Sequence, residues 1–448
     1  MTVPTDRPAP VSLRESFFYW LKLGCIGFGG PAGQIAIMHA DLVERRRWIS
    51  EARFLHALNF CMLLPGPEAQ QLATYIGWLM HRRRGALIAG GLFVLPSLLL
   101  LIGLSWVYLR FGSLPAVAAV LWGIKPAVVA IVLAAAWRIG SRTLKHPLPW
   151  AIAAAAFVAI AALQVPFPAV VFSAALAGLA GAKFVPQAFA GSGGHAGGKN
   201  GYGPALIDDD TPVPAHARRS PAQALQVLAA FVAIWSLALG GLTLAFGWQG
   251  GLTQIGWFFT KAALLTFGGA YAVLPYVFQG AVGHYGWLDA AQMIDGLALG
   301  ETTPGPLIMV VAFVGFVGGW TKALFGPDAQ FAAAVAGATV ATFFTFLPSF
   351  LFILVGAPFI EGTRGQLRFT APLAGIAAAV VGVILSLALF FAGHVFWPTG
   401  LGGHFDLAAA AISAAALLAL QRYRLGTIPT IAACAALGLA WRLLPGLG

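Results

Sequence analysis

Charged residues are scarce in this chain. Asp, Glu, Lys and Arg make up only 9% of its 448 residues, while 59% are hydrophobic. Ordinary soluble domains carry about a quarter charged residues, so this composition excludes a soluble globular protein. It predicts an all-α polytopic membrane protein.

Cysteine is nearly absent, and several cofactor motifs are missing. The three cysteines, Cys25, Cys61 and Cys434, lie far apart in apolar runs, and no CxxC occurs. This pattern argues against a disulfide framework, a redox centre or a zinc site. There is no GxxxxGK[ST] loop for ATP and no flavin or haem motif. We therefore expect no metal and no cofactor.

The basic residues lie in short loops between the apolar runs. The net charge is +11, which could indicate nucleic-acid binding. The loop positions instead favour control of membrane topology and contact with anionic lipids, without nucleic acid. The polar N-terminus, 1–16, lacks an apolar core, so we expect no cleaved signal peptide.

Hydropathy divides the chain into two apolar halves. Apolar segments lie at 17–39, 54–80, 86–109, 115–137, 148–164, 167–183, 225–247, 252–279, 291–318, 330–357, 371–393, 404–420 and 428–444. The Gly-, Pro- and charge-rich stretch between the halves is typical of a flexible linker. The predicted organisation is a polar N-terminus at 1–16, an N-terminal transporter repeat at 17–183, a flexible cytoplasmic linker at 184–224, an extra topology-inverting transmembrane helix at 225–247 and a C-terminal transporter repeat at 248–448.

The two halves are related in sequence. Residues 19–67 align with 258–306 without a gap, and "VLPSLL" around Pro96 resembles "FLPSFL" around Pro348. The matches fall on rare residues: Lys22 with Lys261, Phe28-Gly29-Gly30 with Phe267-Gly268-Gly269, Trp48 with Trp287, and Pro65-Gly66-Pro67 with Pro304-Gly305-Pro306. Internal duplication is a common plan for transporters.

Charge placement favours an inverted-topology repeat. Both basic loops, 45–47 and 82–84, can face the cytoplasm only if 54–80 is a re-entrant hairpin with Pro65-Gly66-Pro67 near its tip. The extra segment 225–247 then inverts the second half. The predicted fold is two homologous halves with broken or re-entrant helices. Whether 17–39 and 252–279 cross or re-enter is left open.

The paired Gly and Pro motifs predict broken helices beside a cavity. Irregular backbone persists at membrane depth only inside protein or next to water, and a helix that starts after a break presents free N–H groups to an anion. The alternative is that these motifs are simple packing kinks. The residues expected to contact a substrate are Lys22, Phe28, Gly29, Gly30, Pro65, Gly66, Pro67, Gln70, Lys261, Phe267, Gly268, Gly269, Thr303, Pro304, Gly305 and Pro306.

A few charged residues lie inside the apolar segments. Lys22 and Lys261 could pair with an anion or extend to the membrane interface. Lys125 is a weaker candidate for substrate contact. Glu68 and Glu301 each lie beside a break, where a carboxylate could carry a coupling proton or cap a helix.

Taken together, these motifs resemble the long-chain chromate transporter family. The resemblance rests on Phe-Gly-Gly-Pro, a basic loop ending in Trp-Ile, Leu-Pro-Gly-Pro-Glu-Ala, and a second Phe-Gly-Gly and Thr-Pro-Gly-Pro, and it covers about residues 12–445. It implies a multi-pass protein of the bacterial inner membrane that exports chromate and confers chromate resistance. The chain departs from a symmetric pattern where Ala270 replaces Pro31 and Leu307 replaces Glu68.

Three functions are compatible with these residues. The first is a secondary exporter of chromate, and the second is an uptake carrier or channel for sulfate or another tetrahedral oxyanion. The third, a membrane-embedded oxyanion reductase, lacks the expected cofactor motif. The expected partners are chromate or sulfate as substrate and anionic lipids, and a homodimer is left open.

Overall fold

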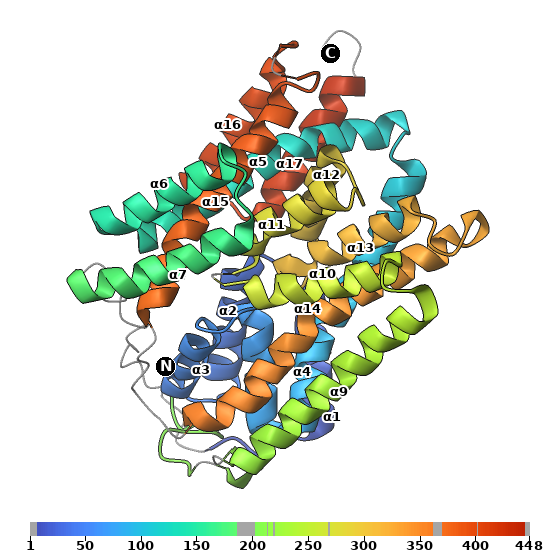
Figure 1. Cartoon of the computed structure of the whole chain (residues 1–448). Helices are drawn as coiled ribbons and strands as arrows, with labels where there is room; N and C mark the ends of the chain where they lie inside the picture. The colour runs from blue at the N-terminus through green and yellow to red at the C-terminus, as the bar shows by residue number, and fades with distance from the viewer. Residues whose placement is uncertain are drawn as a thin grey trace.

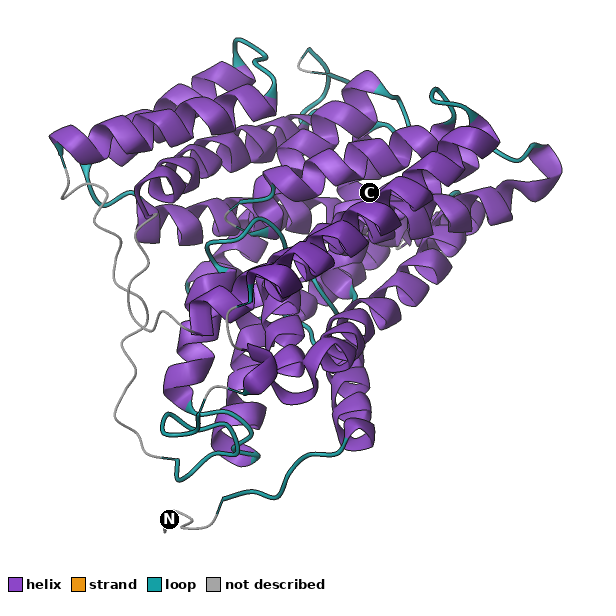
Figure 2. Cartoon of the chain, turned by 60° about the horizontal axis from the view of Figure 1, so that its bottom comes forward, coloured by secondary structure: helices purple, strands orange, loops and turns teal. Residues whose placement is uncertain are grey.

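The structure is a computed structural model that describes residues 7–185, 202–212, 214–217, 220–267, 269–361, 370–400 and 402–443. Within these ranges the chain is helical and forms no strand (Figure 2). The helices of the first half are α1 (Leu13–Ile26), α2 (Gly30–His39), α3 (Glu51–Cys61), α4 (Glu68–Phe111), α5 (Pro115–Thr143), α6 (Pro147–Ala161) and α7 (Phe167–Phe184). After α9 (Pro221–Phe246), the second half contains α10 (Gly251–Leu265), α11 (Ala270–Phe278), α12 (Ala290–Thr302), α13 (Val310–Thr321), α14 (Gln330–Glu361), α15 (Thr370–Phe396), α16 (Leu407–Gln421) and α17 (Thr427–Leu443).

Several of these helices are long and apolar enough to cross a membrane. The six candidate spans are Glu68–Phe111, Pro115–Thr143, Phe167–Phe184, Pro221–Phe246, Pro327–Glu361 and Ala371–Phe396. Helices of this length match the roughly 30 Å hydrocarbon core of a bilayer. The protein is therefore a multi-pass helical membrane protein, as the composition predicts.

Local structure repeats between the halves in the register found in the sequence. The π-helical turn Ala40–Arg45 follows α2, and Gln279–His284 follows α11 at the equivalent position. Each turn leads to a buried tryptophan, Trp48 or Trp287. A side-chain cap then starts the next helix, from Ser50 for α3 and from Asp289 for α12.

The helix α4 is two segments joined by a sharp reversal. His81 and Arg82 leave helical geometry, and Arg82 has a positive φ of 56°. Gly77 and Gly85 then face each other so closely that a side chain on either would collide with the backbone of the other. In a straight helix these residues would be about 12 Å apart, so the chain turns back at Arg82. The same small-residue packing joins α13 to α14 through Gly315 and Gly337.

Each Pro-Gly-Pro motif lies in a hairpin whose two ends meet. In the first hairpin, the buried Arg53 on α3 and Tyr75 on α4 both reach Glu361. In the second, Thr321 at the end of α13 donates a hydrogen bond to the carbonyl of Trp287, 2.9 Å away. These are the hairpins that the sequence predicts.

The two hairpins open at opposite ends of the second segment of α4. Arg82 begins this segment beside the open end of the first hairpin, whereas Tyr108, near its other end, bonds to Asp295 at the start of the second. The segment is about 40 Å long at 1.5 Å per residue. This arrangement is the one expected of an inverted-topology repeat.

The halves also exchange helices. The pair α6 and α7 packs on α15, while α16 and α17 pack on α5 (Figure 1). Close glycine contacts hold both sides, Gly178 against Gly375 and Gly123 against Gly438. The repeats are thus interleaved and do not form separate bodies, a feature that periodicity alone does not indicate.

Part of the predicted flexible linker is packed against the first half. We call residues 202–212 and 214–217 the linker strap; residues 186–201, 213, 218 and 219 lie outside the description. Ile207 forms a parallel bridge with Ile49, and Ser50 donates a 2.6 Å hydrogen bond to Asp209. The ring of His216 lies 3.1 Å from the carbonyl of Trp78, and burial lowers its pKa. This part of the predicted linker therefore contacts the first half, while the predicted bounds of the linker stay a prediction.

Candidate functional site

Four irregular segments meet between the halves. We call residues 27–29 and residues 266, 267 and 269 the glycine breaks, and residues 65–67 and 304–306 the proline loops. The N–H of Gly66 donates to the carbonyl of Thr266, 2.7 Å away, and the N–H of Gly305 donates to the carbonyl of Gly27, 2.9 Å away. The sequence offset of 239 converts the first pair into the second.

These two crossing hydrogen bonds explain how the breaks persist at depth. Gly27 and Thr266 are the C-caps of α1 and α10, whose last carbonyls have no partner within their own helices. Each is satisfied by the proline loop of the other half, as irregular backbone away from water requires. The two halves therefore complete each other's broken helices.

Only glycine fits the centre of either proline loop. Gly66 and Gly305 have φ values of 125° and 97°. A Cβ on Gly66 would lie 2.7 Å from the hydroxyl of Ser349, and one on Gly305 would lie 2.8 Å from Cβ of Ser97. Ser97 and Ser349 are themselves equivalents, from the two Leu-Pro-Ser motifs, so the tight contacts are also reciprocal.

The N-termini of the two helices after the glycine breaks differ in what faces them. Apart from neighbouring backbone of α2, no heavy atom of the described residues lies within 4 Å of a Cβ placed on Gly30, where α2 begins. At the equivalent end of α11, the carboxylate of Glu68 lies 3.8 Å from a Cβ placed on Gly269. The start of α2 is therefore an open, electropositive helix end, while α11 already faces a negative charge.

A buried glutamine that the sequence analysis missed ties this site together. Gln34, fully buried on α2, donates from Nε2 to the carbonyl of Gly27 at 2.9 Å and to the carbonyl of Gly305. It thus holds a glycine break of one half against a proline loop of the other. A polar residue four positions after the Phe-Gly-Gly motif was the available signal.

The polar residues near the proline loops are largely occupied by the backbone and by each other. Gln70 donates to Thr74 at 3.0 Å, and Gln71 donates to the carbonyl of Pro65 at 2.8 Å. Thr302 and Thr303 donate their hydroxyl hydrogens to carbonyls of their own helix. These bonds shape the loops and occupy both threonine hydroxyl donors, while each glutamine amide keeps a second N–H.

The two predicted lysines receive no support from their positions. Lys22 is exposed on α1. The ammonium of Lys261 lies 5.4 Å from the centre of the Trp257 ring, one turn away on α10. Neither forms an ion pair in the part of the chain that the structure describes.

The remaining predicted residues divide by burial. Phe28, Phe267 and Pro65 are half-buried, and Pro67, Pro304 and Pro306 are buried. Gly268 lies outside the described residues. Of the two carboxylates, Glu68 is half-buried, whereas Glu301 is 7% exposed and accepts a 2.5 Å hydrogen bond from Tyr271 on α11.

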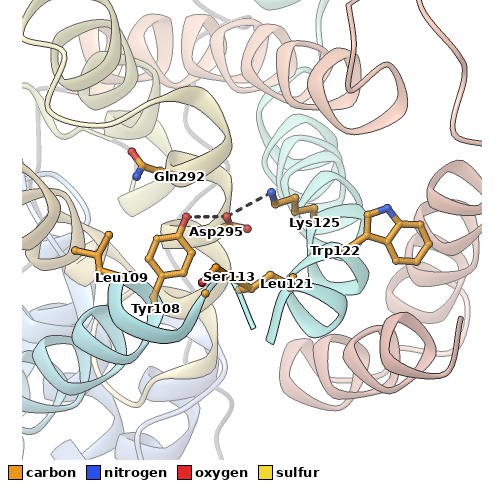
Figure 3. A pocket seen from close by; sticks show the side chains of 10 residues that line it. Tyr108, Leu109, Ser113, Leu121, Trp122, Lys125, Gln292 and Asp295 are labelled. Carbon is orange, nitrogen blue, oxygen red and sulfur yellow. Dashed lines mark hydrogen bonds and ion pairs between the residues drawn. The ribbon is translucent and has the colours of Figure 1, made fainter. Parts of the chain in front are cut away.

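Two further buried charge clusters lie at the open ends of the hairpins. At the end near the linker strap, Arg53 is 4.0 Å from Glu361. At the opposite end, Lys125 is 3.4 Å from Asp295 beside a cavity (Figure 3). The sequence makes Lys125 only a weak candidate for substrate contact, because it does not show that Lys125 and Asp295 meet. No group of three His, Cys, Asp or Glu side chains among the described residues could hold a metal ion.

Comparison with known proteins identifies the family. The model of the chromate transporter family matches residues 14–179 and 253–439. A chromate transport protein of Cupriavidus metallidurans is 31% identical over 384 residues, covering 85% of this chain and 83% of its own. One from Pseudomonas aeruginosa is 35% identical over 383 residues, covering 84% and 80%.

A probable chromate transport protein of Synechococcus elongatus is 30% identical over 377 residues, covering 83% of both chains. No solved structure matches the chain. The family model matches one segment in each half, as a duplicated architecture requires. The chain belongs to the chromate transporter family.

Proposed function

We propose that this protein is a secondary transporter that moves chromate out of the cytoplasm and so gives chromate resistance. The observation that carries the proposal is the open N-terminus of α2 beside two crossing hydrogen bonds. Free backbone amides at a helix end favour an oxyanion. The names of the relatives supply chromate as the substrate.

The physics of the site supports a tetrahedral dianion. The amides at Gly29 and Gly30 lie where α2 begins, and the positive φ values of 89° and 67° turn the backbone at that point. Consecutive amides turned in this way form an anion-binding concavity. Chromate and sulfate share shape and charge, so both fit this description.

The membrane potential favours outward transport of chromate. The cytoplasm is negative, and moving two negative charges outward gains roughly 2 × 2.3 kcal/mol per 100 mV. The chain has no ATP-binding loop, so we propose transport driven by the potential or by exchange. We place the linker strap in the cytoplasm, because the triple-arginine loops at 45–47 and 82–84 lie at the same end.

The proposal is tested by radiolabelled chromate uptake into inside-out membrane vesicles with an imposed potential. We expect accumulation that depends on the potential and that excess sulfate inhibits only weakly. Sulfate flux without chromate accumulation would keep the helix-end site and reassign the substrate. Accumulation of neither anion would contradict the proposal.

A further inference from the structure

A cavity of about 340 Å³ lies at the C-terminal end of α4, which is the end away from the linker strap. Its lining includes Tyr108, Trp122, Lys125, Gln292 and Asp295, from α4, α5 and α12 (Figure 3). None of its lining residues belongs to the glycine breaks, and the proposed transport site does not use it. The cavity is nevertheless large enough for a small oxyanion with its first waters.

An ion pair borders this cavity. Nζ of Lys125 is 3.4 Å from Oδ2 of Asp295, and the hydroxyl of Tyr108 donates to the same oxygen at 3.0 Å. The side chain of Asp295 is 4% exposed and that of Lys125 is 28% exposed. The lysine thus reaches the cavity, while the carboxylate behind it is buried.

One oxygen of this buried carboxylate has no partner. Oδ1 of Asp295 is buried and forms no hydrogen bond in the described chain. A buried carboxylate normally satisfies both oxygens, since an unsatisfied charged atom is costly. The free oxygen is therefore a natural position for a proton.

We propose that this cavity is a second oxyanion site. Lys125 binds the anion there, and the carboxylate of Asp295 competes with the anion for Lys125. When Asp295 is ionised, it holds Lys125 and the site has low affinity. When Oδ1 takes up a proton, the carboxyl becomes neutral and Lys125 is free to bind an oxyanion. The inference rests on the proposed function, because it gives the exported anion a release site on the far face.

Few of the ionisable groups on neighbouring helices contact the carboxylate of Asp295. The ionisable groups on the elements packed against its helix are Lys125, Arg138 and Arg142 on α5, Glu68, Tyr75, His81, Arg82, Arg83, Arg84, Tyr108 and Arg110 on α4, Cys434 and Arg442 on α17, and His394 on α15; its own helix adds Glu301 and the capping residue Asp289. Of these, only Lys125 and Tyr108 contact the Asp295 carboxylate. The segment 307–321, which also packs on α12, contains no ionisable residue.

The test counts bound chromate per chain in purified full-length protein in lipid nanodiscs. For Asp295→Asn we expect one more bound chromate than for the wild type at about pH 8, with an affinity gain of roughly tenfold or more. The wild type should gain this anion only near pH 6. Variants are compared at the same pH, so any protonation of chromate itself affects their binding equally.

Two controls separate the site from general electrostatics. Asp295→Asn combined with Lys125→Gln should lose the additional anion, while Asp289→Asn, which keeps a helix cap, should change affinity less than about twofold. Equal stoichiometry in Asp295→Asn and wild type would overturn the inference. If Asp295→Asn folds poorly, the acid-induced anion of the wild type must still vanish in Lys125→Gln.

The outcome is distinguishable from failure of the proposed function. Wild-type vesicles that transport chromate while Asp295→Asn binds no additional anion would overturn only the second site. Vesicles that do not transport chromate would contradict the proposed function, whatever the stoichiometry.

Discussion

The two glycine breaks have the same backbone but different surroundings. Both end a helix whose carbonyl is capped by the opposite proline loop, and both start a helix after a glycine with φ near 90°. One helix end is open, at Gly30, and the other faces Glu68. Duplication thus built two equivalent helix ends, and two substitutions, Glu68 opposite Leu307 and Pro31 opposite Ala270, made them unequal.

The difference suggests a division of roles. A helix end that already faces a carboxylate has lower affinity for a second anion. We therefore assign substrate binding to the first glycine break. The second break, with Glu68 and Glu301 near it, is the better location for a coupled proton.

The largest expected effect comes from destroying the crossing that both breaks share. Gly305→Val and Gly66→Val each place a side chain at positive φ against a serine of the other half. We expect a stability loss above about 3 kcal/mol and complete loss of chromate transport. Thermal unfolding and vesicle uptake measure the two effects.

A matched glycine elsewhere provides the control for this prediction. Gly91 lies within α4, and no atom would contact an added Cβ there. Gly91→Ala should therefore leave uptake unchanged. Normal transport by Gly305→Val would show that the crossing is not needed.

Removing the charge of Glu68 should make the two breaks more alike. In Glu68→Gln, the start of α11 no longer faces an anion, and a charge at a helix end is worth about 1 kcal/mol. We expect the second break to gain affinity for chromate, which lowers the half-saturating chromate concentration by up to roughly fivefold. Vesicle uptake measured over a series of chromate concentrations would reveal this change. An unchanged half-saturating concentration would show that Glu68 does not influence anion binding.

Glu301 should affect the pH profile more than the affinity. If it carries a coupled proton, Glu301→Gln will remove the pH dependence of transport and preserve chromate binding. Uptake across a series of imposed pH gradients provides the measurement. A pH profile identical to that of the wild type would return Glu301 to a structural role.

The effect on chromate transport should be smallest at Tyr271, which donates to Glu301 and is expected to act mainly on stability. Tyr271→Phe leaves a buried carboxylate short of one donor, a cost of about 1.5–3 kcal/mol. Thermal unfolding in detergent should show a lower midpoint. Tyr276→Phe, on the same helix but without such a bond in the described chain, should lower it less.

The sequence predicted the duplication and the broken helices of this protein better than the contacts between its side chains. The glycine and proline motifs recur at one offset, so duplication and broken helices could be predicted from helix-breaking chemistry alone. Gln34 and the Lys125–Asp295 pair could not, because their partners lie far away in the chain. The roles of Lys22 and Lys261 stay a prediction, because a charge in an apolar run indicates an energetic cost but does not show which way the side chain points.

The linker shows the same limit. Its composition is typical of a flexible segment, yet the N–H of Ser50 donates to the carbonyl of Ile207 and the Ser50 hydroxyl donates to Asp209. A short bridge of this kind depends on a complementary edge elsewhere, at 47–50, which local composition does not reveal. The exchange of α6 and α7 for α16 and α17 is likewise a long-range property.

The most direct test of the account is chromate uptake by Leu307→Glu, compared with Leu307→Gln. By the symmetry of the halves, this change gives the open end of α2 the carboxylate that α11 already faces. We predict that folded Leu307→Glu loses potential-driven chromate accumulation in inside-out vesicles, while Leu307→Gln retains it. Equal accumulation by both variants would contradict the claim that the open break binds the anion.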